Sequence, residues 1–377
     1  MSQLSQQPLK PVLSASVHDV RYFAALLRGL NFTNTQKATV MAYKAGLVIT
    51  VEEARTLLAT AFAKTEIFDE FTYTHPPSEP HSPSQRQRRA NLSQDSMVDD
   101  QPHPDVDDAE KESTAFEIPL NTLIECLNIF GTAGPLPAAS AGTTKRKWKR
   151  AGEGGDDMDR DDGNERVRGP MDTFFGGGKD DKRTGMRMSF QGPGYPLTLL
   201  IAEDATGPTT TCDITTFDPE PSLQLEFDRE STVLEIILKS SWLRDALSEI
   251  DPSCDRLTFI ANPPGQQATG GSGTRLKPIL RIKAAGTFGS TEMDYPNDKE
   301  VLESFICTHA VSVSYHTAYI ARAARGLTSS SKTSLRIDEG GLLSLQFLLP
   351  GAPGGAGSNK QKDAFIDFRC LALDTET

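Results

Sequence analysis

The stretch FEIPLNTLIECLNIFG, residues 116–131, decides the fold. A short extended lead-in meets Pro119, which suits the first turn of a helix, and Gly131 is a stop signal. The apolar residues that follow recur at helical spacing and form one face: Leu120, Leu123, Ile124 and Leu127. A short strand, an amphipathic helix and β-rich sequence recur in this order about four times, with a period of roughly 65–75 residues once insertions are removed. The chain is therefore predicted to be an α+β protein built from repeats.

The same reasoning places the other elements along the chain. Helices are predicted at about 17–30, 240–250 and 312–326. Strands are predicted at 37–43, 47–51, 56–63, 67–73, 186–190, 197–202, 209–215, 223–227, 233–237, 256–261, 278–284, 304–307, 333–337, 342–349 and 364–371.

Two long segments differ in composition from the rest. Residues 75–113 are rich in Pro, Ser, Gln and acidic residues, and residues 132–184 are rich in Gly, Asp and Lys. Such sequence buries too little apolar surface to order itself, so both are predicted to be disordered insertions, as is a polar arm at 1–11. The remainder divides into a first domain at 12–212, a linker at 213–222 and a second domain at 223–373.

Composition limits the classes of function. The chain has 377 residues and a net charge of −12, which argues against DNA binding by the whole surface but permits a local basic strip. Five scattered cysteines without a CxxC motif favour reduced thiols in the cytosol or nucleus. No apolar run approaches the roughly 20 residues that cross a bilayer, and the polar N-terminus resembles neither a signal nor a transit peptide. No membrane association is predicted.

Five blocks carry a family resemblance. They are KATVMAYKAGLVITVEEA at 37–54, FEIPLNTLIECLNIFG at 116–131, RMSFQGPGYPLTLLIAED at 187–204, ILKSSWLRDALSEID at 237–251 and FGSTEMDYP at 288–296. In order and spacing the chain resembles the Rad-one family, which supplies one subunit of the nine-one-one DNA-damage checkpoint clamp. The resemblance spans almost the whole chain except the arm and the two insertions.

The resemblance implies a fold and a role. The fold is that of a DNA sliding clamp, similar to proliferating cell nuclear antigen, with two domains of two strand–helix–multistrand repeats and helices lining a central hole. The implied partners are two other clamp-like subunits, Rad-nine-like and Hus-one-like, which complete a heterotrimeric ring. A clamp loader would place the ring on double-stranded DNA at recessed junctions in the nucleus, where it supports checkpoint kinase signalling and DNA repair. The resemblance implies no cofactor and no metal.

A clamp needs basic side chains that face phosphates without reading sequence. The candidates on the predicted helices are Arg21, Arg28, Lys239, Arg244, Arg322 and Arg325. The second helix carries Glu125 and no Lys or Arg, so the predicted inner surface is uneven. The alternative is that these cations lie on solvated helix faces without a partner.

Ring closure requires free edge strands, since clamp subunits join by pairing them. From the clamp resemblance, one edge is predicted at 209–215 or the nearby linker, and the other near 333–337.

Two motifs lie inside the second insertion. The basic run Lys145, Arg146, Lys147, Lys149 and Arg150 predicts a nuclear import signal, or alternatively a loop with general affinity for nucleic acid.

Met171, Phe174 and Phe175 have the spacing of peptides that dock on proliferating cell nuclear antigen, although Arg168 replaces the usual Gln. The alternative is that these aromatic residues pack on the protein's own surface.

An enzyme is the competing class, because a 3′→5′ exonuclease has been attributed to some members of the resembled family. Two-metal nucleases need converging carboxylates, and Asp218 and Glu220 offer an Asp-x-Glu pattern. Pro219 and Pro221 predict an extended linker there instead of a rigid catalytic strand. We predict no catalytic residues, with the exonuclease kept as the alternative. A structural adaptor that never contacts DNA is the third class.

Overall fold

A computed structural model describes residues 10–33, 35–75, 113–131, 133, 184–203, 207–264, 278–351 and 363–374. Most of the two predicted insertions lies outside these ranges.

The first half of the chain runs from strand to helix to strands, twice over. Its elements are β1 (Leu13–Val17), α1 (Val20–Leu30), β2 (Lys37–Tyr43), β3 (Gly46–Glu53), β4 (Leu57–Lys64), the short 3₁₀ helix η1 (Thr65–Ile67), β5 (Glu70–Tyr73), β6 (Thr114–Pro119), α4 (Leu120–Leu127), β7 (Gly185–Phe190), β8 (Leu197–Ala202) and β9 (Thr209–Ile214).

The second half repeats this order. Its elements are β10 (Thr232–Lys239), α5 (Ser240–Ser248), β11 (Cys254–Ala261), β12 (Leu280–Gly286), β13 (Gly289–Tyr295), β14 (Leu302–Cys307), β15 (Val311–His316), α6 (Thr317–Leu327), β16 (Lys332–Asp338), β17 (Leu343–Leu349) and β18 (Ala364–Cys370). The predicted internal repeat is therefore visible in the element order.

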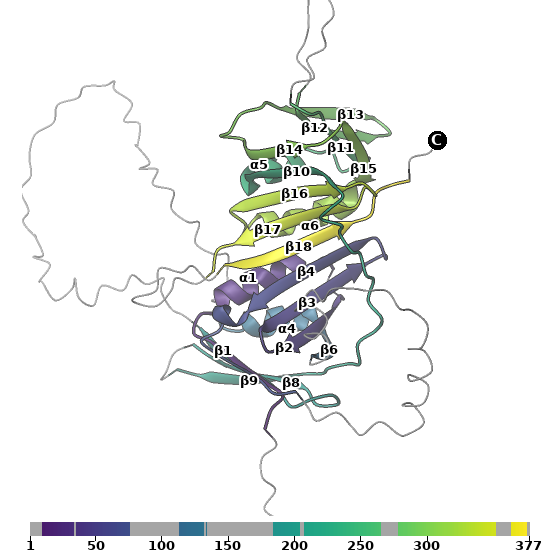
Figure 1. The fold of residues 1–377 in the computed structure, drawn as a ribbon. Helices are drawn as coiled ribbons and strands as arrows, with labels where there is room; N and C mark the ends of the chain where they lie inside the picture. The colour runs from purple at the N-terminus through teal and green to yellow at the C-terminus, as the bar shows by residue number, and fades with distance from the viewer. Residues whose placement is uncertain are drawn as a thin grey trace, which may run out of the picture.

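The strands form three antiparallel sheets. A nine-stranded sheet has the order β14-β10-β16-β17-β18-β4-β3-β2-β6, and it joins the two halves where β18 pairs with β4. A five-stranded sheet, β5-β1-β7-β8-β9, and a four-stranded sheet, β13-β12-β11-β15, complete the fold. In Figure 1 the nine-stranded sheet faces the viewer and the two smaller sheets lie at its opposite ends.

Alternation along the strands explains which face is buried. In β2, Ala38, Val40 and Ala42 are buried, whereas Thr39 and Met41 on the opposite face are partly exposed. The same period of two is seen in β3 and β4, so one face of the large sheet turns toward the core.

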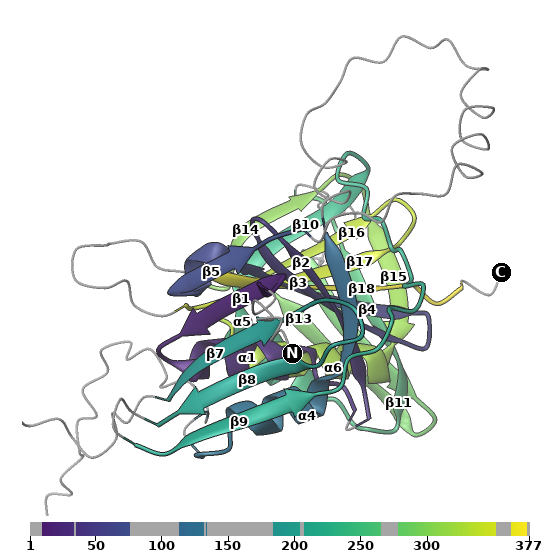
Figure 2. The same ribbon diagram turned by 90° about the horizontal axis from the view of Figure 1, so that it is seen from below.

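The helices cover that buried face. They contact one another in the sequence α5–α6–α1–α4, and they lie behind the large sheet in Figure 1. Figure 2 shows α1 and α4 behind the five-stranded sheet. Helix α1 is buried almost all round, because it contacts α6, α4, β4 and β18. One hydrophobic core therefore runs through both halves.

Three local predictions were wrong. The helix predicted from residue 312 begins at Thr317, because VSVSY at 311–315 alternates as a strand and pairs with β11. Residues 223–227 form no strand; they pack as an irregular segment on Leu58 and Leu342. Strand β13 was not predicted, since Ser, Glu and Asp give it weak strand propensity.

Candidate nucleic-acid interface and free sheet edges

Helices α1 and α6 approach each other closely through two glycines. A Cβ atom on Gly29 would lie 3.6 Å from Cα of Gly326, and one on Gly326 would lie 2.6 Å from Cδ2 of Phe347. A Cβ on Gly29 would also clash with Cδ1 of Ile366, so each glycine makes room for a core side chain beneath its helix. Each glycine follows an arginine, Arg28 in α1 and Arg325 in α6, so the crossing brings the two guanidinium groups to the same region.

Arg28 and Arg325 line one cavity of about 310 Å³ between the C-terminal ends of α1, α4 and α6. The Nη2 atom of Arg28 donates to the carbonyl of Ala133, and Nη1 of Arg325 donates to the carbonyl of Asn31. Burial lowers the pKa of Arg28, but a guanidinium stays charged in proteins. The cavity therefore holds two positive charges oriented by backbone carbonyls, without a carboxylate among its lining residues.

Two of the other predicted cations are neutralised by carboxylates. Nη2 of Arg21 lies 2.6 Å from Oδ2 of Asp19, the residue that also caps α1. Arg322 forms an ion pair with Glu53 of β3, and burial lowers the pKa of Arg322. The side chains of Arg21 and Arg322 are only 17% and 29% exposed, so both charges act mainly in ion pairs within the protein.

The remaining two cations belong to α5, Lys239 at its N-cap and Arg244 within the helix. Lys239 is exposed at the end of β10, and Nη2 of Arg244 lies 3.2 Å from Oδ1 of Asp245. The exposed face of α5 also presents Trp242 and Glu249. On α4, Asn121 donates to Glu125 at 2.7 Å. The helical surface is thus most positive near the α1–α6 crossing and mixed in charge along α5.

Several predicted residues cannot be placed. The basic run Lys145–Arg150 and the docking-type residues Met171, Phe174 and Phe175 lie outside the described residues.

In the described part of the chain each of the three sheets is open, with terminal strands β5 and β9, β14 and β6, and β13 and β15. Strand β9 pairs only with β8, as predicted for 209–215, and β13 pairs only with β12. The prediction of an edge near 333–337 was wrong, because β16 lies between β10 and β17 inside the large sheet. The pairing that encloses β16 is long-range, so its local sequence could not reveal it.

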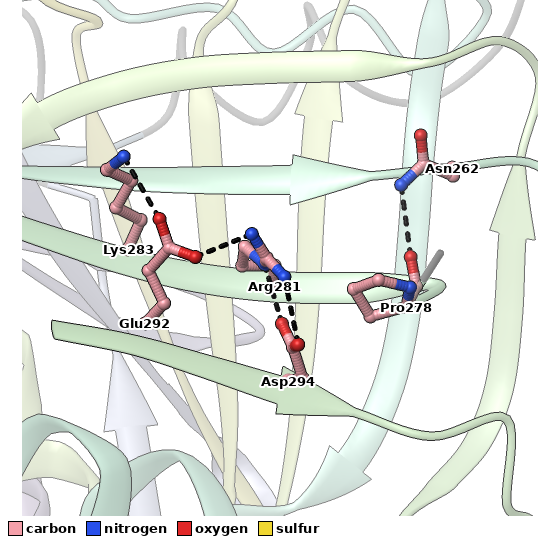
Figure 3. A network of polar contacts seen from close by, with 6 residues as sticks. All are labelled: Asn262, Pro278, Arg281, Lys283, Glu292 and Asp294. Carbon is pink, nitrogen blue, oxygen red and sulfur yellow. Dashed lines mark hydrogen bonds and ion pairs between the residues drawn. The ribbon is translucent and has the colours of Figure 1, made fainter. Parts of the chain in front are cut away.

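Charges on the β13 edge are satisfied by its neighbour (Figure 3). Nε of Arg281 lies 2.6 Å from Oδ1 of Asp294, Nη1 of Arg281 lies 2.6 Å from Oε2 of Glu292, and Nζ of Lys283 lies 3.0 Å from Oε1 of Glu292. The hydrogen bond that Arg281 donates to Asp294 raises the pKa of Arg281, and the hydrogen bond that Lys283 donates to Glu292 lowers the pKa of Glu292. Strand β13 thus carries two acids whose charges are compensated on β12.

The same figure shows the base of this hairpin, where Nδ2 of Asn262 donates to the carbonyl of Pro278 at 3.0 Å. This contact fixes the chain at the point where it enters β12. The hairpin that carries the free edge is therefore anchored at its open end.

The acidic pair considered for catalysis lies in the segment that connects β9 to β10. The backbone N–H of Glu220 donates to Oε1 of Glu117 at 2.8 Å, and Nζ of Lys37 lies 3.4 Å from Glu117 and 3.6 Å from Glu220. Asp218 is exposed. Within the described ranges no cluster of three His, Cys, Asp or Glu side chains has the geometry for a metal ion. Nor does any helix there have the length and apolar character to cross a membrane.

Comparison with known proteins agrees with this architecture. A family profile described as "Repair protein Rad1/Rec1/Rad17" matches residues 12–349. The cell cycle checkpoint protein RAD1 of Homo sapiens is 27% identical over 358 residues, covering 95% of this chain and 90% of the relative. The DNA repair exonuclease REC1 of Mycosarcoma maydis is 28% identical over 452 residues, covering 97% of this chain and 96% of the relative.

Solved structures give the fold. Proliferating Cellular Nuclear Antigen from Entamoeba histolytica matches with a TM-score of 0.56 at 12% identity, covering 97% of this chain and 100% of that chain. At this level of identity the likeness concerns fold alone, and the fold is that of a sliding clamp.

Proposed function

The chain belongs to the Rad1/Rec1/Rad17 family of repair proteins, and from this premise we propose that it is a non-catalytic subunit of a heterotrimeric checkpoint clamp. The clamp encircles double-stranded DNA at recessed junctions and supports checkpoint kinase signalling and repair in the nucleus. Its partners are two further clamp-like subunits, Rad-nine-like and Hus-one-like, and a clamp loader. The predicted domains, 12–212 and 223–373 with a linker at 213–222, form one arc of the ring.

One observation carries this proposal. Two of the six sheet-terminal strands in the described residues, β9 in one small sheet and β13 in the other, lie at opposite ends of the large sheet. An unpaired edge exposes backbone donors and acceptors, and proteins usually cover such edges. A ring of subunits covers both edges at once, since each joint pairs the edge of one subunit with that of the next.

The DNA contact belongs to the helical surface. The six predicted cations divide by environment, with Arg28 and Arg325 lining one cavity at the α1–α6 crossing. Phosphate oxygens that approach the α1–α6 crossing would meet these two guanidinium groups first. Arg21, Arg244 and Arg322 are compensated by Asp19, Asp245 and Glu53, so we assign them a smaller share.

The test is assembly followed by topology. The chain is co-expressed with the two clamp-like subunits of its own organism, sized, and loaded on circular or linearised DNA by a clamp loader. A 1:1:1 complex that stays on circles and slides off linear DNA is the expected result. A chain that stays monomeric with both subunits would contradict the proposal.

A 3′→5′ exonuclease is the second candidate, because one relative bears the name DNA repair exonuclease. It would depend on Asp218 and Glu220, which the connecting segment holds apart from any larger acidic cluster in the described residues. Purified protein is incubated with end-labelled DNA in Mg²⁺, next to an Asp218→Asn, Glu220→Gln variant. Degradation by the wild type that the variant loses would establish the nuclease.

Two smaller proposals concern the second insertion. Lys145, Arg146, Lys147, Lys149 and Arg150 form a nuclear import signal, and their replacement by Ala should move a fluorescent fusion to the cytoplasm.

Met171, Phe174 and Phe175 form a peptide that docks on a replicative clamp. Titration calorimetry of a 163–180 peptide tests this, and absence of heat at high concentration would reject it.

A further inference from the structure

The pairing of β4 with β18 joins the two halves of the chain. Each of these two strands has a counterpart in the other half that ends a small sheet. Because the element order repeats, β13 occupies in the second half the position of β4 in the first, and β9 occupies the position of β18. Within the chain, β4 and β18 pair antiparallel, with Phe62 opposite Phe365 and Leu57 opposite Cys370. The β4–β18 joint is therefore a template for pairing β13 with the β9-type strand of a neighbouring subunit.

The template also places the turn that precedes each strand. At the internal joint, the turn before β4 lies beside the C-terminal end of β18, where the N–H of Leu371 donates to the carbonyl of Thr56 at 3.0 Å. Transferred to a joint between subunits, the turn before β13 comes to lie beside the C-terminal end of the neighbour's β9. That turn consists of Thr287 and Phe288.

Phe288 is the most exposed large apolar side chain in the described residues. Gly286 and Gly289 pair across the hairpin, so Thr287 and Phe288 form its apex, and the Phe288 side chain is 90% exposed. An aromatic ring held at a hairpin tip, next to a free edge, has the form of an anchor for a partner's pocket.

A receiving pocket lies at the corresponding place on this chain. Just beyond the C-terminal end of β9 is a cavity of about 410 Å³ whose lining includes Pro193, Gly194, Thr216, Phe217 and Pro219. Phe217 is held there by two backbone hydrogen bonds of 2.9 Å to Glu117, one in each direction.

Aromatic surface borders this cavity. Phe217 is 45% exposed, with Nζ of Lys37 at 4.9 Å from its ring centroid. Tyr195 is equally exposed, and its carbonyl accepts a hydrogen bond from Oγ1 of Thr216 at 2.8 Å. The pocket is thus preorganised and offers an aromatic wall, which favours an apolar or aromatic tip.

We propose that each ring joint contains a hairpin tip in a pocket. Phe288 enters the pocket of one neighbouring clamp-like subunit, and the pocket at Phe217 receives the β12–β13-type hairpin of the other neighbour. This rests on the ring assembly proposed above and adds the contact that selects which subunit sits on which side. Compensation of Glu292 and Asp294 by Arg281 and Lys283 lets the β13 edge approach a neighbour without unpaired charge.

The experiment measures each joint separately. Pairwise affinities of this chain for each of the two clamp-like subunits are determined by surface plasmon resonance without DNA, for wild type, Phe288→Ser, Phe217→Ser and Phe288→Leu. Trp242→Ser is the matched control, since Trp242 is an aromatic residue on α5, 43% exposed, and belongs to neither edge strand. Thermal melting confirms that every variant is folded.

The expected result is asymmetric. Phe288→Ser should weaken one pair by roughly 10- to 100-fold, the range that burial of one aromatic side chain gives, while Phe288→Leu retains most of the affinity. Phe217→Ser should weaken only the other pair, and Trp242→Ser neither.

Unchanged affinities for both Ser variants, with wild-type pairs intact, would overturn the tip-in-pocket contact and leave the ring standing. Weakening of the same pair by both variants would overturn it as well. Failure of the wild type to bind either subunit would instead overturn the ring.

Discussion

Arg28 and Arg325 reach the same cavity from two helices that are far apart in the sequence, whereas Arg322, three residues before Arg325, is held by Glu53. The difference is environmental, since all three are arginines on helices of the same core. Arg322 pairs with a carboxylate, whereas Nη2 of Arg28 and Nη1 of Arg325 each donate to a backbone carbonyl.

We therefore expect Arg28→Ala, Arg325→Ala in the loaded clamp to shorten retention on circular DNA. The slope of log affinity against log salt should fall by about one for each phosphate group that the variant no longer binds. Arg322→Ala is the comparison and should lower that slope less, because Glu53 compensates the charge of Arg322. An equal effect of both changes would show that the helical surface acts only through its total charge.

Cys370 gives a prediction for alkaline pH. Burial raises the pKa of this thiol from an ordinary value of 9.0 to about 12. Between these values the unfolded chain loses the proton and the folded chain keeps it, so the free energy of unfolding falls as pH rises from about 9 to about 12. The contribution is at most ~1.4 kcal/mol per pH unit.

Urea denaturation at pH 7.5 to 10.5 should show a shallower decline in Cys370→Ala than in wild type. Parallel declines would assign the alkaline sensitivity to other groups. Tyr315, whose pKa is also raised by burial, is the first of these.

At the scale of elements, Gly326 lets α6 lie close to the core side chain of Phe347 in β17. Alanine favours a helix over glycine by about 1 kcal/mol, but a Cβ on Gly326 would lie 2.6 Å from Phe347. Overpacking costs about 1–3 kcal/mol, so Gly326→Ala should lower the free energy of unfolding despite its better helix propensity. Ala321→Gly, on the exposed face of the same helix, should cost only the propensity difference. A stabilised Gly326→Ala would show that Phe347 can move aside.

Local pattern predicted most elements and missed those decided by distant partners. The apolar face at 120–127 and the alternation in β2 and β4 are strong local signals, and each element was found. Strand β13 is polar and follows a two-residue turn, and only its pairing with β12 makes it a strand. The alternation at 311–315 was available in the sequence and was outweighed by the helix that follows.

The same limit applied to the site. The sequence places Arg21, Arg28, Arg322 and Arg325 on helices, but it cannot show which of them meets an acid. Glu53 approaches Arg322 from a strand of the other half, and the cavity shared by Arg28 and Arg325 exists only once α1 and α6 cross.

At the scale of the molecule, the β4–β18 pairing makes both halves share one sheet and one core. We expect calorimetry of the isolated chain to give a single cooperative transition, because neither half can unfold without exposing the other. Phe368→Ala, which empties the core at this joint, should lower the midpoint of the whole transition, at a cost of about 3–5 kcal/mol. Two separated transitions would show that the halves are independent.

The connecting segment adds to this unity. Oε2 of Glu52 accepts from the N–H of Leu223 at 2.8 Å, and the guanidinium of Arg336 lies 5.1 Å from the ring centroid of Phe227. The segment is thus tied to strands from both halves.

A sheet that runs unbroken from β14 to β6 gives the molecule the mechanical character of a stiff arc. Bending such an arc at its midpoint would require sliding or tearing the ladder between β4 and β18, whereas separating two subunits of the proposed ring would break one edge-to-edge ladder and release the proposed hairpin-tip contact. In any closed assembly of these arcs, the contacts between subunits are therefore the parts that deform most easily. A motor that opens it to admit a strand of DNA would do its work at one of those seams and would leave the curvature of each arc intact.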